Sequence, residues 1–450
     1  MSLLEIAAYA AIFLLASFSF AFFLKKKLKA QVILRIISII RSKKPLAFFE
    51  KFAKFKRFLH WFANIGLIIG FGSIAIDYLY ARGLSKPKRI IVFLASFTEL
   101  YLILYLVLSR IQASAMLAEN FVLILSSFAF FGLAGFTIVL LGINAVDIIA
   151  KTLIGEKALP GIAPIIPGVK IPNVPIFVPL HGWLSLLIIL VIHESAHGII
   201  ARMHKIKLKT AGIILFGFLP LGAFVEPDEK KFEKEKPLKK MQVLSAGSMA
   251  NIALFAIALG VFTILFSALI TPFILPNVVV AGVKEYSVVN GENVISPAFG
   301  KLHAGDTVLE INGVKVSSVE QLSSMVKESQ VLNFKIKTAK GLVKTISVEK
   351  NPAGVIGAFF EQPFDEKMPP FNVLIVEFFF WLFMLNLFVA IANFMPVEPF
   401  DGGKIAKIML APYLGFLKMP EKETEKFVSR AFIWIIGLIL LVNALPLFQF

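Results

Sequence analysis

Long apolar stretches recur along this chain of 450 residues and limit what it can fold into. About 20 apolar residues cross the hydrocarbon core of a bilayer as a helix, because a helix satisfies its own backbone hydrogen bonds there. Hydrophobic residues make up 58% of the sequence, as expected for an α-helical protein that crosses a membrane many times. The pattern predicts eight spans, at about 4–24, 61–80, 90–109, 121–146, 179–201, 243–271, 371–395 and 430–448.

Basic residues predict the orientation of these spans. The loop between the first two carries 12 lysines and arginines against one acid, Glu50, so we expect it in the cytoplasm and the N-terminus outside. Alternate counting brings the fifth span into the cytoplasm at its C-terminal end, in agreement with the basic segment 202–209, whereas the basic loop 82–89 disagrees. The net charge of +17 is therefore a signal of topology and of contact with lipid headgroups, and no basic groove indicates nucleic-acid binding. The absence of cysteine excludes disulfides and thiolate-bound metals.

Three segments break the pattern of spans. Residues 211–224 are apolar but short and glycine-rich, which predicts a β-hairpin or a re-entrant loop. Residues 226–240 mix acids with lysines and predict a solvated connecting segment. Residues 277–352 predict a small separate domain, with strands at 307–316 and 334–338 and a helix at 319–326. Alternate counting places that domain outside.

The fifth span ends in a sequence typical of zinc hydrolases. His193 and His197 are four residues apart, so both lie on one face of a helix, with Glu194 beside them. Zinc held by histidine and carboxylate ligands with one open position activates water at neutral pH. The alternative is a pair of histidines that only hydrogen-bond to carboxylates or carbonyls. Ionisable groups at membrane depth are costly, however, which favours a function.

A third metal ligand is expected near another span. Asp401 stands where two prolines and two glycines break the chain after the seventh span. That span also runs from outside to inside, so Asp401 reaches the same side as the histidines. Alternatively, Asp401 caps a short helix at 404–410.

These motifs together resemble the site-2 protease family of intramembrane zinc metalloproteases. The resemblance covers about 176–450 and leaves the first four spans outside the shared core. Phe400 stands where leucine is more usual and Ser248 where proline is often found. The small domain resembles a PDZ module through Ser296-Pro297-Ala298 and the run from Ala304 to Gly313. The membrane motifs that carry the resemblance are His193-Glu194-x-x-His197, Ala246-Gly247-Ser248-Met249-Ala250-Asn251 and Asn393-x-x-Pro396-x-x-x-x-Asp401-Gly402.

The resemblance implies an endopeptidase with one zinc ion per chain, held by His193, His197 and Asp401. It implies that Glu194 is the general base and that Asn251 and Asn393 hold the substrate backbone or stabilise the oxyanion. The alternative for both asparagines is ordinary hydrogen bonding between helices of the bundle. Substrates would be single-span membrane proteins that unwind and pair with a strand edge in the 211–224 segment, although a purely structural hairpin fits the sequence equally. The outer PDZ-like domain would bind the end left by an earlier cut or exclude substrates with a bulky outer domain; alternatively, it only packs on the membrane core. The active site would lie near the cytoplasmic side of the cell membrane. The implied domains are N-terminal spans (1–150), a first catalytic half (176–275), the PDZ-like domain (277–352) and a second catalytic half (370–450).

Two other readings compete. A membrane-embedded prenyl-protein protease shares the histidine pattern but takes a glutamate as its third ligand, against which the Asp401 motif argues. A scaffold or transporter with a structural metal site has no use for Glu194, so the presence of Glu194 favours catalysis.

Overall fold

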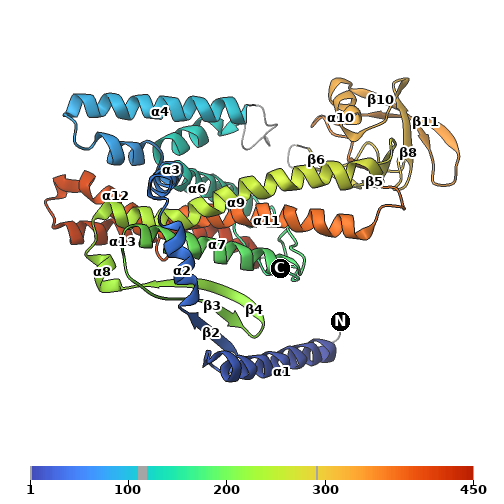
Figure 1. Ribbon diagram of the computed structural model, residues 1–450. Helices are drawn as coiled ribbons and strands as arrows, with labels where there is room; N and C mark the ends of the chain where they lie inside the picture. Colours follow the sequence, from blue (N-terminus) through green and yellow to red (C-terminus); the bar gives the residue numbers. More distant parts are fainter. Residues whose placement is uncertain (1–2, 110–118, 290–291, 449–450) are drawn as a thin grey trace. The chain divides into compact units, whose positions relative to one another are not determined.

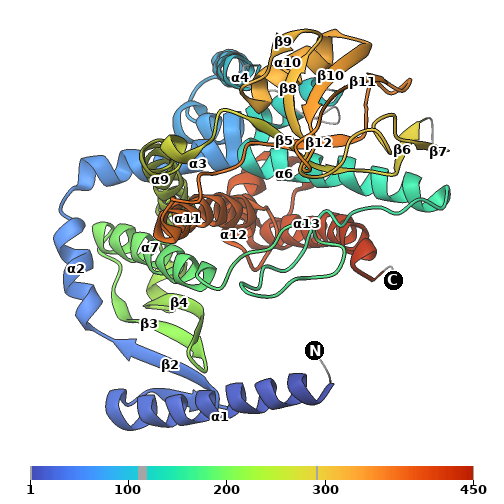
Figure 2. The same ribbon diagram turned by 90° about the vertical axis from the view of Figure 1, so that its right-hand side faces the viewer.

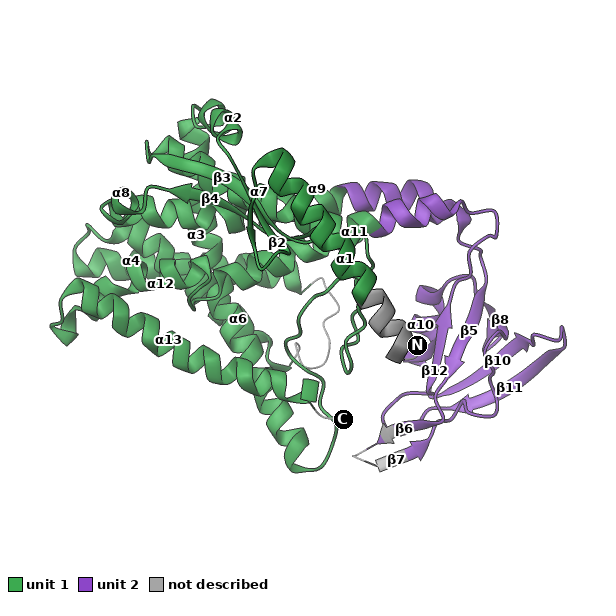
Figure 3. Ribbon diagram, turned by 90° about the horizontal axis from the view of Figure 1, so that it is seen from below, with its two compact units in different colours: residues 1–260, 378–450 green, residues 261–377 purple. Residues whose placement is uncertain are grey.

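The computed structural model describes residues 3–109, 119–289 and 292–448. It comprises two compact units (Figure 3). Unit 1 contains Met1–Gly260 and Phe378–Phe450, and unit 2 contains Val261–Glu377.

Seven helices of the described residues are long and apolar enough to cross a membrane. They coincide with the second to eighth predicted spans. The first predicted span falls in α1 (Leu3–Leu28), part of whose side chains lie outside the described residues, and it is not among the seven. The seven are α3 (Lys56–Ile76) with η1 (Asp77–Ala81), α4 (Lys86–Leu108), α6 (Phe121–Leu153), α7 (Gly182–Met203), α9 (Pro237–Leu269), α11 (Pro370–Phe394) and α13 (Glu421–Ala444).

Helices α3 and α6 cross with their backbones in contact. Each is interrupted by a glycine at positive φ, Gly72 at 55° and Gly132 at 58°. A Cβ on Gly132 would lie 2.4 Å from the carbonyl carbon of Gly70, so no larger residue fits the crossing. The hydroxyl of Ser73 donates to the carbonyl of Ala129 at 2.7 Å, which fixes the register of the pair.

The main core of unit 1 joins the N-terminal helices to the later ones. Phe71 of α3 packs edge-to-face on Phe131 of α6 and on Phe394 of α11. Because lipid is as apolar as these side chains, the rings stabilise the helix contacts by close packing and not by transfer out of water. The core also contains Met241 and Leu244 of α9, and Ile405, Ala406 and Met409 of α12 (Asp401–Leu410). Figures 1 and 2 show α7, α9 and α11 lying side by side within this bundle.

A four-stranded antiparallel sheet accompanies the helices, in the order β1-β2-β3-β4 (Figure 2). The hairpin of β3 (Leu208–Phe216) and β4 (Leu219–Pro227) confirms the β-hairpin alternative for 211–224. The sequence analysis did not predict its partners β1 (Gln31–Ile33) and β2 (Ile37–Ser42), which come from the first basic loop. Strand β2 pairs with β3 from Ile37↔Phe216 to Ser42↔Ala211. Helix α2 (Lys44–Phe52) then leads to α3.

Unit 2 contains a β-rich domain. Its main sheet has the order β11-β10-β8-β5-β12, with β9 paired to β8. The strands and helix predicted at 307–316, 334–338 and 319–326 are confirmed, and the PDZ-like identity stays a prediction. The sheet extends past residue 352, because β12 pairs with β5. The elements are β5 (Val278–Val283), β8 (Thr307–Ile311), β9 (Val314–Lys315), α10 (Val319–Glu328), β10 (Val331–Lys337), β11 (Val343–Glu349), β12 (Ala358–Glu361) and a separate hairpin of β6 (Tyr286–Val289) and β7 (Glu292–Ile295).

Candidate metal centre

The two histidines of α7 face the same space as the aspartate of α12. The Nε2 atoms of His193 and His197 lie 3.4 and 3.0 Å from Oδ2 of Asp401. The candidate ligand atoms of the three residues all lie within 4.8 Å of one another, and His193 is only 6% exposed. The structure therefore brings together the three residues predicted as ligands, from positions about 200 residues apart in the chain.

Close backbone packing places Asp401 here. Helix α11 ends at Phe394, and Asp401 begins α12 after a short irregular segment. A Cβ on Gly402 would lie 2.4 Å from the carbonyl carbon of Phe394, and one on Gly403 would lie 2.3 Å from the carbonyl carbon of Val397. Two glycines after the aspartate thus let the first turn of α12 pack against the end of α11. Asp401 is the first residue of the helix, whose N-cap is Phe400.

The hydrogen bond made by Nδ1 of each imidazole determines which ring nitrogen carries the proton. Nδ1 of His197 lies 2.7 Å from the carbonyl oxygen of Val243, so it carries the proton and donates, leaving the lone pair on Nε2. Nδ1 of His193 lies 3.0 Å from the side-chain amide of Asn251. With the Asn251 amide turned over, its otherwise unpartnered Oδ1 accepts from Nδ1–H. With both Nδ1 atoms protonated, the Nε2 atoms that face Asp401 would be available to ligate a metal ion.

The chemistry of this donor set fits a metal ion. Two neutral imidazoles and one carboxylate form a three-ligand set of the kind that holds catalytic zinc. Gly247 of α9 faces the same point: a Cβ there would lie 2.5 Å from Nε2 of both histidines. A glycine at this position leaves room beside the ligand atoms that any side chain would fill.

Glu194 is fixed by the edge of the β-sheet. The backbone N–H of Val225, on β4, donates to Oε2 of Glu194 at 3.1 Å. Strand β4 is the terminal strand of its sheet. The glutamate is thereby held between the histidine helix and the strand, with Oε1 left for other partners.

Lys404 binds the oxygen of Asp401 that faces away from the histidines. Its Nζ lies 3.4 Å from Oδ1, whereas Oδ2 faces the imidazoles. The lysine therefore holds the carboxylate so that a single oxygen points at the metal position. The sequence analysis missed this residue, although its spacing of three after Asp401 on a helix was a usable signal.

The cluster opens into a cavity of about 450 Å³ lined by Glu194, Val225, Lys404 and the three candidate ligands. Asn393 also lines it, and its Nδ2 donates to the carbonyl of Val389 in its own helix. Asn251, the other predicted substrate-binding residue, contacts His193 instead and is fully buried.

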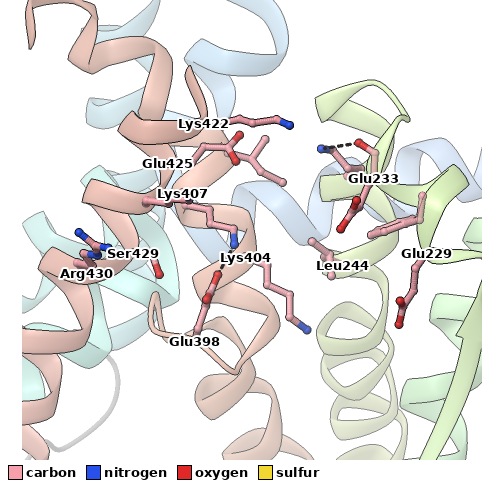
Figure 4. Close-up of a pocket in the computed structure, with 14 residues that line it drawn as sticks. Glu229, Glu233, Leu244, Glu398, Lys404, Lys407, Lys422, Glu425, Ser429 and Arg430 are labelled. Carbon is pink, nitrogen blue, oxygen red and sulfur yellow. Dashed lines mark hydrogen bonds and ion pairs between the residues drawn. The ribbon is translucent and has the colours of Figure 1, made fainter. Parts of the chain in front are cut away.

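A charged pocket of about 620 Å³ shares Phe232, Leu244 and Lys404 with this cavity. Figure 4 shows Lys404 and Lys422 extending from the C-terminal helices toward the segment that carries Glu229 and Glu233. Lys407 pairs with Glu398 at its wall. The cavity at the candidate metal centre thus shares part of its wall with a pocket lined by charged side chains. The charged side chains of the pocket are Glu229, Glu233, Lys240, Glu398, Lys404, Lys407, Lys422, Glu425, Lys426 and Arg430.

A bundle of apolar helices with a His-His-Asp cluster and an adjacent glutamate defines a membrane-embedded, metal-dependent hydrolase. The family model of peptidase family M50 matches residues 181–441. The chain belongs to this family, the site-2 proteases, and is accordingly a metalloendopeptidase of the membrane. The match begins at α7, so α1 to α6 lie before it.

Two proteins are similar to this chain, and one of them is a membrane metalloprotease. The chain is 27% identical over 294 residues to an uncharacterised protein of Methanocaldococcus jannaschii, which covers 64% of this chain and 70% of that protein. It is 23% identical over 347 residues to the chloroplastic membrane metalloprotease ARASP of Arabidopsis thaliana, which covers 57% of this chain and 76% of that protein.

Proposed function

We propose that this protein is a zinc-dependent intramembrane endopeptidase that cuts the membrane span of single-span substrates. The observation that carries the proposal is the cavity in which His193, His197 and Asp401 lie beside Glu194 and the edge of β4. Its family membership supports peptide-bond hydrolysis at the membrane.

The three ligands would hold one zinc ion through Nε2 of each histidine and Oδ2 of Asp401. Zinc, when bound, supplies a Lewis acid that activates water at neutral pH. The proton-bearing Nδ1 atoms keep both imidazoles in the ligating tautomer. Lys404 limits Asp401 to one ligating oxygen.

Glu194 is the proposed general base. Its Oε2 is occupied by the N–H of Val225, so Oε1 takes the proton of the attacking water and later delivers it to the leaving amine. A structural metal site would have no need of this carboxylate.

Strand β4 is the proposed binding edge for the substrate. A helical substrate hides its scissile amide in its own hydrogen bonds, so it must unwind before cleavage. Among the described residues no strand pairs with the outer edge of β4, so an unwound segment can add there as a further strand. Val225 of this edge holds Glu194, which places the general base next to the segment being cut.

Asn393 is assigned to the substrate backbone, because its amide lines the cavity and keeps a carbonyl oxygen and one N–H for a peptide group. Asn251 is assigned to His193, since it is buried behind the imidazole. Water reaches the metal position through the charged pocket, which we place on the cytoplasmic side of the cell membrane. The β-rich domain then lies outside and, as a PDZ-like module, selects substrates by the end or bulk of their outer segment.

The test is cleavage of a single-span model substrate by purified protein in detergent, with wild type beside Glu194→Gln. We expect wild type to cut within the span and Glu194→Gln to bind zinc equally but cut about 10²–10⁴-fold more slowly. Zinc content is measured on both proteins by atomic absorption. Zinc bound by both with no cutting by either would support a structural metal, and no zinc on either would refute the ligand assignment.

A further inference from the structure

Helix α3 lies outside the matched family region, yet it touches the two elements that orient His197 and carry Asp401. Helix α3 and its continuation η1 make buried hydrogen bonds to later elements in addition to apolar contacts. They lead to the metal position by two routes, one through α9 and the other through α12.

The first route runs through the turn of α9 whose carbonyl orients His197. Asn64 of α3 accepts from Nε2 of Gln242 at 2.7 Å, and the carbonyl of Ala63 accepts from the hydroxyl of Ser245 at 3.0 Å. These two bonds flank Val243, whose carbonyl accepts from Nδ1 of His197. Helix α3 thus fixes the height and rotation of the acceptor that sets the His197 tautomer.

The side-chain amide of Gln242 also contacts the end of α7. Oε1 of Gln242 lies 2.8 Å from Nε2 of His204, which follows the last residue of α7. Burial lowers the pKa of His204 to about 4, so the ring is neutral at pH 7 and its Nε2–H donates to Gln242. Asn64, Gln242 and His204 therefore form a chain of side-chain hydrogen bonds across α3, α9 and α7.

The second route ends at η3 (Ala411–Leu417), the 3-10 helix that directly follows α12, the helix that carries Asp401. Asp77 of η1 is 2% exposed and binds Nε of Arg89 at 2.7 Å. The hydroxyl of Tyr413 donates to Oδ2 of the same carboxylate at 2.5 Å, and the Arg89 guanidinium lies 5.0 Å from the centre of the Tyr413 ring. Tyr413 belongs to η3. Burial, together with the hydrogen bond to Asp77, raises the pKa of Tyr413 above its usual value, so the hydroxyl stays protonated and donates.

We propose that Asn64 and the Asp77–Arg89–Tyr413 cluster are positioning residues of the metal centre, through which the N-terminal helices set its zinc affinity. Asn64 acts on His197 through Gln242 and Val243, and Tyr413 acts on Asp401 through α12. The inference rests on the proposed zinc site and gives the N-terminal helices a role in the site itself.

The chain offers a matched control for the first route. Nδ2 of Asn144 on α6 donates to Oδ1 of Asn443 on α13 at 2.8 Å. Like the Asn64–Gln242 bond, this hydrogen bond joins an N-terminal helix to a later helix through two carboxamide side chains. Helix α13, however, carries none of the candidate metal ligands. Its loss should lower stability without affecting the metal.

The experiment measures zinc affinity by competition with a chromophoric chelator, and melting temperature, on full-length protein in detergent. The variants are Asn64→Leu, Tyr413→Phe, their combination, Asn64→Asp and the control Asn144→Leu. We expect Asn64→Leu and Tyr413→Phe each to weaken zinc binding about 10-fold, within the range for groups that orient ligands. Because the two routes share no residue, the combination should lose about 100-fold. Asn64→Asp keeps the acceptor oxygen and should stay close to wild type.

Wild-type zinc affinity in both Asn64→Leu and Tyr413→Phe, with only their melting temperatures lowered, would show a purely structural role and overturn the proposal. An equal loss of affinity in Asn144→Leu would overturn it as well, because general destabilisation would then explain the effect. A wild type that binds no zinc would refute the proposed function, and this inference with it. That failure is visible before any variant is compared.

Discussion

A single missing Cβ decides how closely α9 approaches the candidate metal ligands. Gly247 is the residue of α9 that faces Nε2 of both histidines. In the sequence Gly247 belongs to a recognisable motif, but no role can be predicted for it, because no local pattern shows which side chains face a glycine. In the structure its missing side chain is what leaves the metal position open.

Gly247→Ala should weaken zinc binding. Its Cβ would lie 2.5 Å from both Nε2 atoms, so either the ring positions or α9 must shift. We expect a loss of at least about 10-fold in zinc affinity, by analogy with changes that disturb ligand orientation. Chelator competition measures this effect. The control is Gly260→Ala on the same helix, where a Cβ meets nothing within 4 Å and zinc affinity should not change. If Gly247→Ala and Gly260→Ala have the same zinc affinity, Gly247 does not have the role assigned to it.

Among the structural elements, the β3–β4 hairpin combines an apolar surface with a hydrogen bond to Glu194, the proposed general base. Phe216 and Phe218 at its turn pack on Phe13 of α1, and Leu221 on β4 is 53% exposed. The same strand binds Glu194 through Val225. An apolar strand with an exposed leucine suits a membrane surface, and under the proposed function a substrate in the bilayer would add to the edge of that strand.

Leu221→Lys should impair cleavage of membrane-embedded substrates selectively. A lysine costs roughly 2.5–3.5 kcal/mol at bilayer depth, so the hairpin should withdraw from the membrane or exclude the substrate. We expect at least a 10-fold lower rate on a single-span substrate in liposomes, about 1.4 kcal/mol, and an unchanged rate on a water-soluble peptide. Leu342→Lys, a similarly exposed leucine in the β-rich domain, should change neither rate. If Leu221→Lys cleaves the substrate in liposomes at the wild-type rate, the hairpin does not take part in substrate binding.

The expected spans at 61–80 and 121–146 followed from composition, but the kinks within α3 and α6 did not. Each kink exists because Gly72 and Gly132 meet across the crossing, and neither helix contains that information alone. Likewise, β1 and β2 lie in a basic loop whose strand character depends on pairing with β3, about 175 residues later.

For the whole molecule, zinc would join two regions that are far apart in the sequence. The histidines lie on α7 and the aspartate on α12, and in the described part of the chain these two helices share no hydrogen bond outside the cluster. An ion bound by both should therefore stabilise the fold of unit 1. The stabilisation follows mass action and reaches about 2.7 kcal/mol when free zinc is 100 times its Kd.

Removal of zinc by a chelator should accordingly lower the melting temperature of the wild type, and added zinc should restore it. Differential scanning fluorimetry in detergent measures both shifts. Asp401→Asn should melt at the same temperature with zinc or chelator, because the ligand from α12 is lost. A zinc-dependent shift that persists in Asp401→Asn would place the stabilising ion elsewhere.

Local patterns in the sequence determined the class of this protein. Apolar length predicted the spans, the four-residue spacing put His193 and His197 on one helix face, and alternation predicted the strands of the small domain. The tertiary structure alone decided what surrounds those residues: the Val243 carbonyl on His197, the amide of Asn251 on His193, and the Asp77–Tyr413 contact that joins the N-terminal helices to α12. The physical reason is the separation along the chain between the residues that interact. Helical and strand periodicity depends on neighbours in the chain, whereas orientation of the metal ligands depends on hydrogen bonds between residues 46 to 336 positions apart.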